Sequence, residues 1–261
     1  MAFTDRFIDV AGCRTHYRRG GKGAPLVFLH GAGGMPIVLP FMEKLAQRFD
    51  VIVPDHPGYG QSDEPEWLEN IHDVAYFYLD FLAALELDAV VLVGNSMGGW
   101  MAMEIAVRNT SRIASLVLVS PAGIRVEGGA SGAEPADIFL LSPEDTVRLL
   151  FHDPKLAEER LSVPPTAESI DLGLKNRHTT ARLAWEPRLH DPMLPKWLHR
   201  IDVPVSIVWG AQDQLLPVGM AHEIKRLVPE AELNILERCG HLPHVEKMEE
   251  FCALVERFAC R

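Results

Sequence analysis

The stretch Val91-Leu92-Val93-Gly94-Asn95-Ser96-Met97-Gly98-Gly99 places a serine between glycines where an apolar run gives way to a helical pattern. The apolar residues before the serine are typical of a buried strand, and residues 100–107 supply the apolar positions of a helix. Glycine lacks a Cβ, so it permits the close approach of strand and helix that a sharp turn needs. The stretch therefore predicts a nucleophile elbow, with Ser96 on a strained corner of the backbone.

The composition bounds the kind of protein and its partners. A chain of 261 residues with 48% hydrophobic content can bury a substantial core as one domain, or as one domain with an insertion. Its formal charge of -11 argues against nucleic acid or an anionic membrane as a partner, because both attract basic surfaces. No apolar signal-peptide core follows Met1, and no segment is apolar enough to span a bilayer. We expect a cytoplasmic protein that acts on a small molecule, and the composition is compatible with a homo-oligomer.

The cysteines and histidines do not form a metal motif. The four cysteines are Cys13, Cys239, Cys252 and Cys260. Their scattered spacing favours reduced, mostly buried thiols over a disulfide framework. His241 and His244 have no third ligand at metal-site spacing, and a zinc motif such as His-Glu-x-x-His does not occur. The sequence therefore predicts no metal site. No organic cofactor is expected either, because a serine with a base and an acid supplies the nucleophile, the base and the electrostatics by itself.

Short apolar runs alternate with helical patterns along most of the chain, which is typical of a doubly wound α/β sheet. Residues 6–10 and 13–19 alternate around the turn Ala11-Gly12, which predicts an antiparallel hairpin. Six further strands are expected at residues 26–29, 51–53, 90–93, 115–119, 205–209 and 233–236. We therefore predict an eight-stranded, mostly parallel sheet with helices on both faces.

Residues 124–200 break this alternation, because strand-like runs disappear and prolines become frequent among short helical patterns. We interpret the segment as a helical cap inserted into a core made of residues 1–123 and 201–261. The apolar residues of the cap that could line a lid are Phe139, Leu140, Leu141, Leu149, Leu150, Phe151, Trp185, Met193 and Trp197. Packing within the cap explains most of them more simply, because a small helical unit must bury one face.

A serine nucleophile needs a base, and His241 follows the last strand-like run. The acid that orients this base is expected after the preceding strand, where Trp209-Gly210-Ala211-Gln212-Asp213 provides a carboxylate. Open α/β sheets build their sites at the carboxyl ends of their strands, and all three residues would lie there. We therefore predict a catalytic triad of Ser96, Asp213 and His241.

Five motifs resemble those of the α/β-hydrolase superfamily, over nearly the whole chain. They are the elbow, His30-Gly31-Ala32-Gly33-Gly34, Asp55-His56-Pro57-Gly58-Tyr59-Gly60-Gln61-Ser62, Gly210-x-x-Asp213 and Gly240-His241. The resemblance implies a serine hydrolase whose triad runs in the order Ser96, Asp213, His241, with the cap after the sixth core strand. It also implies an oxyanion hole made of the backbone N–H groups of Met97 and Ala32. We expect His30 and Asp55 to fix loops rather than to take part in the chemistry.

Two reactions agree with these motifs. The first is hydrolysis of a carboxylic ester of a small, mostly apolar substrate through an acyl-enzyme. The second is hydrolysis of a carbon-carbon bond, because Gly-Asn-Ser-Met-Gly-Gly looks like the meta-cleavage-product hydrolases (2-hydroxy-6-oxo-dienoate hydrolases), which often carry asparagine before the nucleophile. That group usually has tryptophan directly after the catalytic histidine, whereas this chain has Leu242, and the His-Gly loop lacks the asparagine expected there. We therefore prefer the ester.

Three side chains are predicted to contact the substrate: Asn95, Leu242 and Trp185. An aspartate nucleophile, which dehalogenases and epoxide hydrolases need at the elbow, is excluded by Ser96. A protein that keeps the pocket and binds a ligand without catalysis is a third hypothesis. Nothing in the sequence requires it, because every member of the triad is present.

Overall fold

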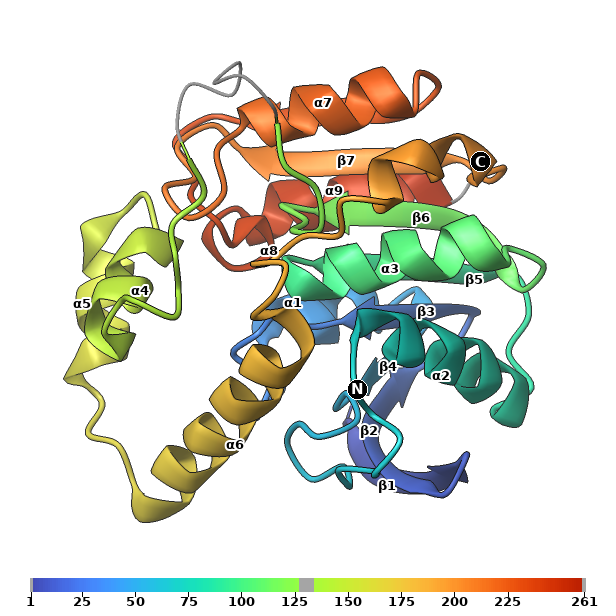
Figure 1. The fold of residues 1–261 in the computed structure, drawn as a ribbon, viewed down its shortest axis with the longest axis horizontal. Helices are drawn as coiled ribbons and strands as arrows, with labels where there is room; N and C mark the ends of the chain where they lie inside the picture. Colours follow the sequence, from blue (N-terminus) through green and yellow to red (C-terminus); the bar gives the residue numbers. More distant parts are fainter. Residues whose placement is uncertain (1, 127–133, 260–261) are drawn as a thin grey trace.

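The computed structural model describes residues 2–126 and 134–259. Within them, eight strands form one sheet in the order β1-β2-β4-β3-β5-β6-β7-β8 (Figure 1). Strand β2 pairs antiparallel with both β1 and β4, and the other neighbouring strands are parallel. The predicted α/β sheet, mostly parallel and eight-stranded, is confirmed.

Each predicted strand has a counterpart that extends one or two residues further at one or both ends. The strands are β1 Thr4–Val10, β2 Cys13–Gly21, β3 Ala24–Leu29, β4 Phe49–Pro54, β5 Val90–Asn95, β6 Ile113–Val119, β7 Val205–Gly210 and β8 Glu232–Leu236. The strands are longer than the apolar runs from which they were predicted, because the backbone hydrogen bonds between neighbouring strands do not depend on the side chains.

Helices cover both faces of the sheet. They are α1 Pro40–Leu45, α2 Ile71–Ala84, α3 Met97–Arg108, α4 Pro143–Leu150, α5 Pro154–Ser162, α6 Ala167–Ala184, α7 Gly219–Leu227, α8 Pro243–Glu246 and α9 Met248–Ala259. Two short 3₁₀ helices, η2 Leu194–Lys196 and η3 Leu198–Arg200, precede β7. Helices α2, α3 and α7 pack on one face, and α1 and α9 pack on the other (Figure 1).

Strand β5 illustrates why the central strands are apolar on both sides. Successive side chains of a strand point to opposite faces, so Leu92 belongs to the core under α2 and α3. Val91 and Val93 belong to the second core, under α1 and α9. All three are at most 2% exposed, as expected for a strand covered by helices on both faces.

The segment between β6 and β7 carries α4, α5, α6, η2 and η3, and its described residues contain no strand. Figure 1 shows α4, α5 and α6 beside the end of the sheet at which β7 terminates. Residues 127–133 of the predicted cap lie outside the described residues. The division of the chain into a core and a cap at residues 124–200 stays a prediction.

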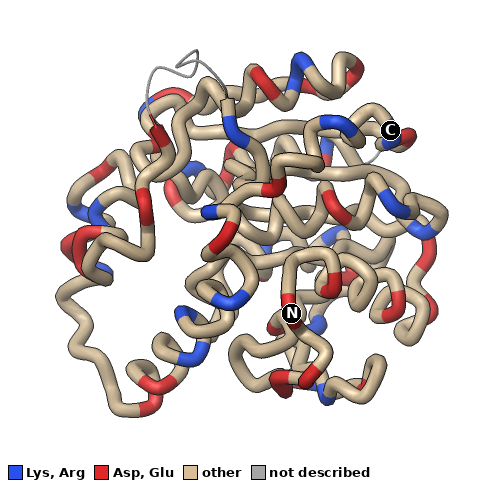
Figure 2. The backbone as a smooth tube through the Cα atoms, in the orientation of Figure 1, with Lys and Arg blue, Asp and Glu red and all other residues tan. Residues whose placement is uncertain are grey.

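Acidic and basic residues are interspersed along the surface helices and loops (Figure 2). None of the helices in the described ranges combines the length and the apolar character that crossing a bilayer requires. Cys13, Cys239 and Cys252 are buried free thiols, and Cys260 lies outside the described residues.

Candidate active site

Ser96 occupies the turn between β5 and α3 with φ 55° and ψ -119°, a backbone conformation that is strained for a residue with a Cβ. The flanking glycines have no room for a side chain. A Cβ on Gly94 would lie 2.4 Å from the carbonyl oxygen of Gly98, and a Cβ on Gly98 would lie 2.2 Å from that of Leu29. The elbow that the sequence predicted is therefore enforced by close contact of β5, α3 and β3.

His241 and Asp213 form a buried pair on the loops that follow β8 and β7. The Nδ1 atom of His241 lies 2.8 Å from Oδ2 of Asp213, and both side chains are at most 2% exposed. The Oδ1 atom of Asp213 accepts hydrogen bonds from the backbone N–H groups of Leu215 and Leu216, each at 2.9 Å. Because the carboxylate acts as acceptor at both oxygens, Nδ1 is the donor, and Nε2 is left as the basic nitrogen.

The loops after β7 and β8 touch directly, which fixes the spacing of the pair. A Cβ on Gly210 would lie 2.0 Å from the carbonyl oxygen of Gly240, so glycine is required at the contact. The backbone N–H of Gln212 donates to the carbonyl oxygen of Cys239 at 2.9 Å. The backbone N–H of His241 donates to the carbonyl oxygen of Leu150 at 2.8 Å, which joins the histidine to the end of α4.

Glu246, at the end of α8, holds the same loop from the other side. Its carboxylate accepts hydrogen bonds from the backbone N–H groups of Gly240 and Asp153. It therefore connects the residue before His241 to the residue that caps α5. This role of Glu246 could not be predicted from the sequence, because no motif marks an acid whose partners are backbone groups of two distant segments.

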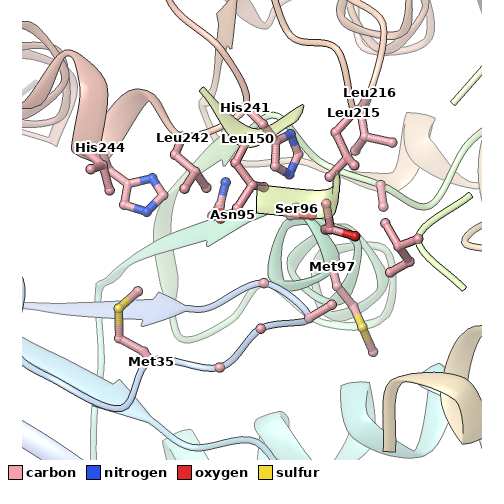
Figure 3. A pocket seen from close by; sticks show the side chains of 18 of the residues that line it. Met35, Asn95, Ser96, Met97, Leu150, Leu215, Leu216, His241, Leu242 and His244 are labelled. Atoms are coloured by element: carbon pink, nitrogen blue, oxygen red, sulfur yellow. The ribbon is translucent and has the colours of Figure 1, made fainter. Parts of the chain in front are cut away.

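Ser96 and His241 line one cavity of about 280 Å³ (Figure 3). The predicted residues Ala32, Met97 and Asn95 line it as well, and so does Leu242. No hydrogen bond joins Oγ of Ser96 to Nε2 of His241, and Nε2 has no partner within residues 2–126 and 134–259. In serine hydrolases the contact between nucleophile and base is often open in the absence of substrate and tightens when it binds.

Residues 26–254 match the alpha/beta hydrolase family. The chain belongs to this family. An uncharacterized protein of Mycobacterium tuberculosis is 30% identical to it, over 98% of this chain and 81% of that protein. A 2-hydroxy-6-oxo-6-(2'-aminophenyl)hexa-2,4-dienoic acid hydrolase of Metapseudomonas resinovorans is 27% identical, over 100% of this chain and 92% of that protein.

Solved structures share the fold of this alpha/beta hydrolase. A 2-hydroxy-6-oxo-6-phenylhexa-2,4-dienoate hydrolase from Rhodococcus sp. strain RHA1 superposes with a TM-score of 0.80 at 22% identity, over 100% of this chain and 99% of that one. An esterase from Rhodococcus sp. ECU1013 gives a TM-score of 0.73 at 24% identity, with the same coverage. The predicted hydrolase fold and enzyme class are confirmed, and the proteins similar to this chain include both meta-cleavage hydrolases and esterases.

In this hydrolase Trp185 lies outside the cavity, contrary to the expectation from the sequence. Its side chain is 50% exposed at the end of α6 and packs edge-on against Phe139, with ring centroids 5.2 Å apart. The guanidinium of Arg188 lies 4.1 Å from the centre of the indole ring. Trp185 is therefore occupied by a surface stack, and Leu150 and Phe151 are the predicted cap residues that do line the cavity.

His30 and Asp55 make the contacts of loop-fixing residues. The Nδ1 atom of His30 lies 2.8 Å from the carbonyl oxygen of Gly31, and burial lowers the pKa of this imidazole. The carboxylate of Asp55 lies 2.9 Å from Nδ1 of His16 and accepts a hydrogen bond from the backbone N–H of Gln61 at 2.8 Å. Neither side chain lines the cavity of Ser96.

One group of side chains in the described ranges has the composition of a metal site. Ligand atoms of His72, Glu104 and Asp191 lie within 4.8 Å of one another, and none of the three residues lines the cavity of Ser96. The guanidinium of Arg108 already contacts Glu104 at 2.6 Å and His72 at 2.7 Å. Because this cation neutralises the buried carboxylate of Glu104, we assign the group to an ion-pair network that joins α2 and α3 to Asp191, which follows α6.

Proposed function

We propose that this chain is a serine hydrolase that cleaves a carboxylic ester of a small, mostly apolar substrate. The observation that supports it best is that one cavity is lined both by Ser96 on its strained turn and by His241, whose Nδ1 is engaged by Asp213. A nucleophile, a base of fixed tautomer and a space for the substrate are the parts that acyl transfer requires.

In this proposal the reaction begins when Nε2 of His241 removes the proton of the Ser96 hydroxyl as Oγ attacks the ester carbonyl. Asp213 keeps Nδ1 protonated and stabilises the imidazolium that forms. His241 then gives the proton to the leaving alcohol, and an acyl-enzyme remains on Ser96. A water molecule, activated by the same imidazole, hydrolyses it and restores the serine.

The negative charge on the carbonyl oxygen would be held by the backbone N–H groups of Met97 and Ala32. Met97 is the first residue of α3, so its N–H has no acceptor inside the helix, and the positive end of the helix dipole favours an anion there. Both residues line the cavity beside Ser96. One such donor lowers a barrier of this kind by roughly 3 kcal/mol.

Carbon-carbon bond hydrolysis of the meta-cleavage type is the second candidate. It is supported by relatives such as the 2-hydroxymuconate semialdehyde hydrolase of Pseudomonas sp. strain CF600, which is 27% identical over 97% of this chain and 93% of that protein. Asn95 also favours it, because the meta-cleavage group often carries asparagine before the nucleophile. Its Nδ2 donates to the carbonyl oxygen of Val119 at 3.1 Å, and its amide oxygen, which makes no hydrogen bond to the described residues, is free to contact a substrate. Leu242 at the cavity still favours the ester, since the meta-cleavage group usually has tryptophan there.

The experiment that tests the proposal compares wild type and Ser96→Ala on a graded series of acyl esters and on a ring-fission dienoate. Labelling with a serine-reactive fluorophosphonate measures the nucleophile separately from the substrate. We expect label and ester turnover in wild type, and neither in Ser96→Ala. Faster turnover of the dienoate would replace the ester by the second candidate. Equal labelling of both proteins would refute Ser96 as the nucleophile.

A further inference from the structure

His244 is a buried histidine for which the proposed triad has no use. It is the second residue of α8, is 2% exposed and lines the same cavity as Ser96 and His241. Neither of its ring nitrogens makes a hydrogen bond to the described residues, and Nδ1 is completely shielded from solvent. Figure 3 shows its imidazole projecting from α8 toward the side of the cavity that holds Asn95.

The surroundings of His244 are those of an apolar side chain. Its ring packs against Phe28, Phe41 and Phe251, with centroid distances of 5.4, 5.0 and 6.0 Å. A phenylalanine or leucine would fill this space without burying a polar atom. An imidazole there costs free energy unless something satisfies its nitrogens.

The other buried histidines of the described chain, apart from His241, have hydrogen-bond partners for their ring nitrogens. His16 contacts Asp55 and Asp5, His30 contacts the carbonyl oxygen of Gly31 and the backbone N–H of His56, and His56 contacts Tyr78 and the carbonyl oxygen of His30. Only His241 and His244 keep a buried ring nitrogen without a partner, and both line the cavity. For His241 the open nitrogen is the proposed base. For His244 we infer that the hydrogen-bond partner of the ring is a group of the substrate.

The ring of His244 is neutral at physiological pH. Burial, and secondarily the neighbouring His241, lower its pKa to about 3. A neutral imidazole can present either an N–H donor or an acceptor nitrogen to the cavity, according to its tautomer, and a hydroxyl group can pair with either one. A carboxylate or phosphate would require a cation instead. Among the described residues that line this cavity, Arg160 is the one with a cationic side chain, and it lies on the exposed surface of α5 rather than beside His244 in the phenylalanine cluster.

We propose that His244 is a specificity-determining residue that binds an uncharged hydroxyl group of the substrate. Figure 3 shows His244 and Met35 to the left of Ser96, whereas Leu215 and Leu216 lie above it, beside His241. In this proposal the hydroxyl group of the substrate lies on the His244 side of the reacting carbon. This inference rests on the proposed function, and it narrows the substrate from apolar esters in general to esters with a hydroxyl group in one arm.

The test measures binding, so that it does not depend on turnover. The protein is Ser96→Ala, alone and combined with His244→Phe, which keeps an aromatic ring in the phenylalanine cluster. The ligands are methyl hexanoate and its 2-, 3- and 6-hydroxy derivatives, with affinities from titration calorimetry. We expect one hydroxy ester to bind about tenfold more tightly than methyl hexanoate to Ser96→Ala, and the preference to vanish with His244→Phe.

A second variant keeps the test decisive if His244→Phe does not fold, and a spectroscopic signal reports on the imidazole ring itself. His244→Gln keeps an amide that can donate and accept, so it should retain part of the preference if His244→Phe fails to fold. The ¹⁵N resonances of the His244 ring should shift with the preferred hydroxy ester and not with methyl hexanoate. Equal preference with and without the imidazole, or no binding of any hydroxy ester, would overturn the inference. Fluorophosphonate labelling of Ser96 in wild type is unaffected by that outcome, so a failure here is distinguishable from failure of the proposed function.

Discussion

The carboxylate of Glu246 accepts a hydrogen bond from the backbone N–H of Gly240, the residue that precedes His241. The same carboxylate accepts the backbone N–H of Asp153 at 2.6 Å. Placement of the proposed base is therefore shared between its own loop, α8 and the start of α5. His241 is held by its backbone as well as by its side-chain contact with Asp213.

Glu246→Gln should lower kcat about ten- to hundredfold with a smaller change in KM, because the amide nitrogen would face a backbone N–H that needs an acceptor. Steady-state kinetics on the best ester of the series measures the effect. Glu250→Gln, an exposed acid on α9, is the matched control and should behave as wild type. A kcat for Glu246→Gln equal to that of the control would contradict the positioning role.

Asp213→Asn should reduce kcat by about 10⁴-fold while the protein stays folded. The amide oxygen of asparagine can still accept the backbone N–H groups of Leu215 and Leu216, which keeps the loop in place. Its NH₂ group would face Nδ1 of His241, which fixes the tautomer with the proton on Nε2 and so removes the base. Steady-state kinetics tests the loss of kcat, and a thermal melt tests whether the protein stays folded. We expect the activity to be lost and the Tm to stay close to that of wild type. Near-normal kcat would show that another acid orients the histidine.

Gly98→Ala should prevent normal folding, because the new Cβ would lie 2.2 Å from the carbonyl oxygen of Leu29 and 2.5 Å from that of His30. Backbone atoms of a central strand cannot move away, so soluble yield and Tm should both drop. Gly173→Ala is the control, since a Cβ there meets nothing within 4 Å. Because Gly173 lies in α6, that change should stabilise the protein by about 1 kcal/mol. Equal yields and melting temperatures for the two variants would refute the close contact of β3 and α3.

Acid should destabilise the fold through its buried neutral histidines. The pKa of His244 is lowered to about 3 by burial, and burial also lowers the pKa of His30 and of His56. Below pH 6.5 the unfolded chain binds protons that the folded chain refuses, so the stability these groups contribute is complete above pH 6.5 and declines as the pH falls. His16 and His72, whose pKa values are raised despite the opposing effect of burial, contribute in the opposite sense: their stabilisation is complete below pH 6.5 and is lost at higher pH.

His244→Phe should therefore flatten the acid side of the stability curve. The variant takes up one proton fewer on unfolding, which reduces the slope of the unfolding free energy against pH by up to about 1.4 kcal/mol per pH unit between pH 6 and pH 4. Urea denaturation at pH 4, 5, 6, 7 and 8 provides the slopes of variant and wild type. The two slopes should coincide above pH 7.5. Parallel curves throughout the acid range would mean that the folded protein already protonates His244.

The sheet and the proposed catalytic residues could be predicted because they depend on local signals. Apolar runs marked the strands, and the elbow glycines have a steric cause within a few residues. The surroundings of His244 could not be predicted, since its three phenylalanine neighbours come from β3, α1 and α9, far apart in the sequence. The position of Trp185 could not be predicted for the same reason: its hydrophobicity is a property of the residue, but its stack against Phe139 and Arg188 depends on where α6 ends.

The hydrogen bond from the backbone N–H of His241 to the carbonyl oxygen of Leu150 has a consequence for ligand binding. Leu150 ends α4 and forms part of the wall of the cavity, so the same hydrogen bond links the shape of that wall to the position of the proposed base. A ligand that displaced the end of α4 would therefore also displace the backbone of His241.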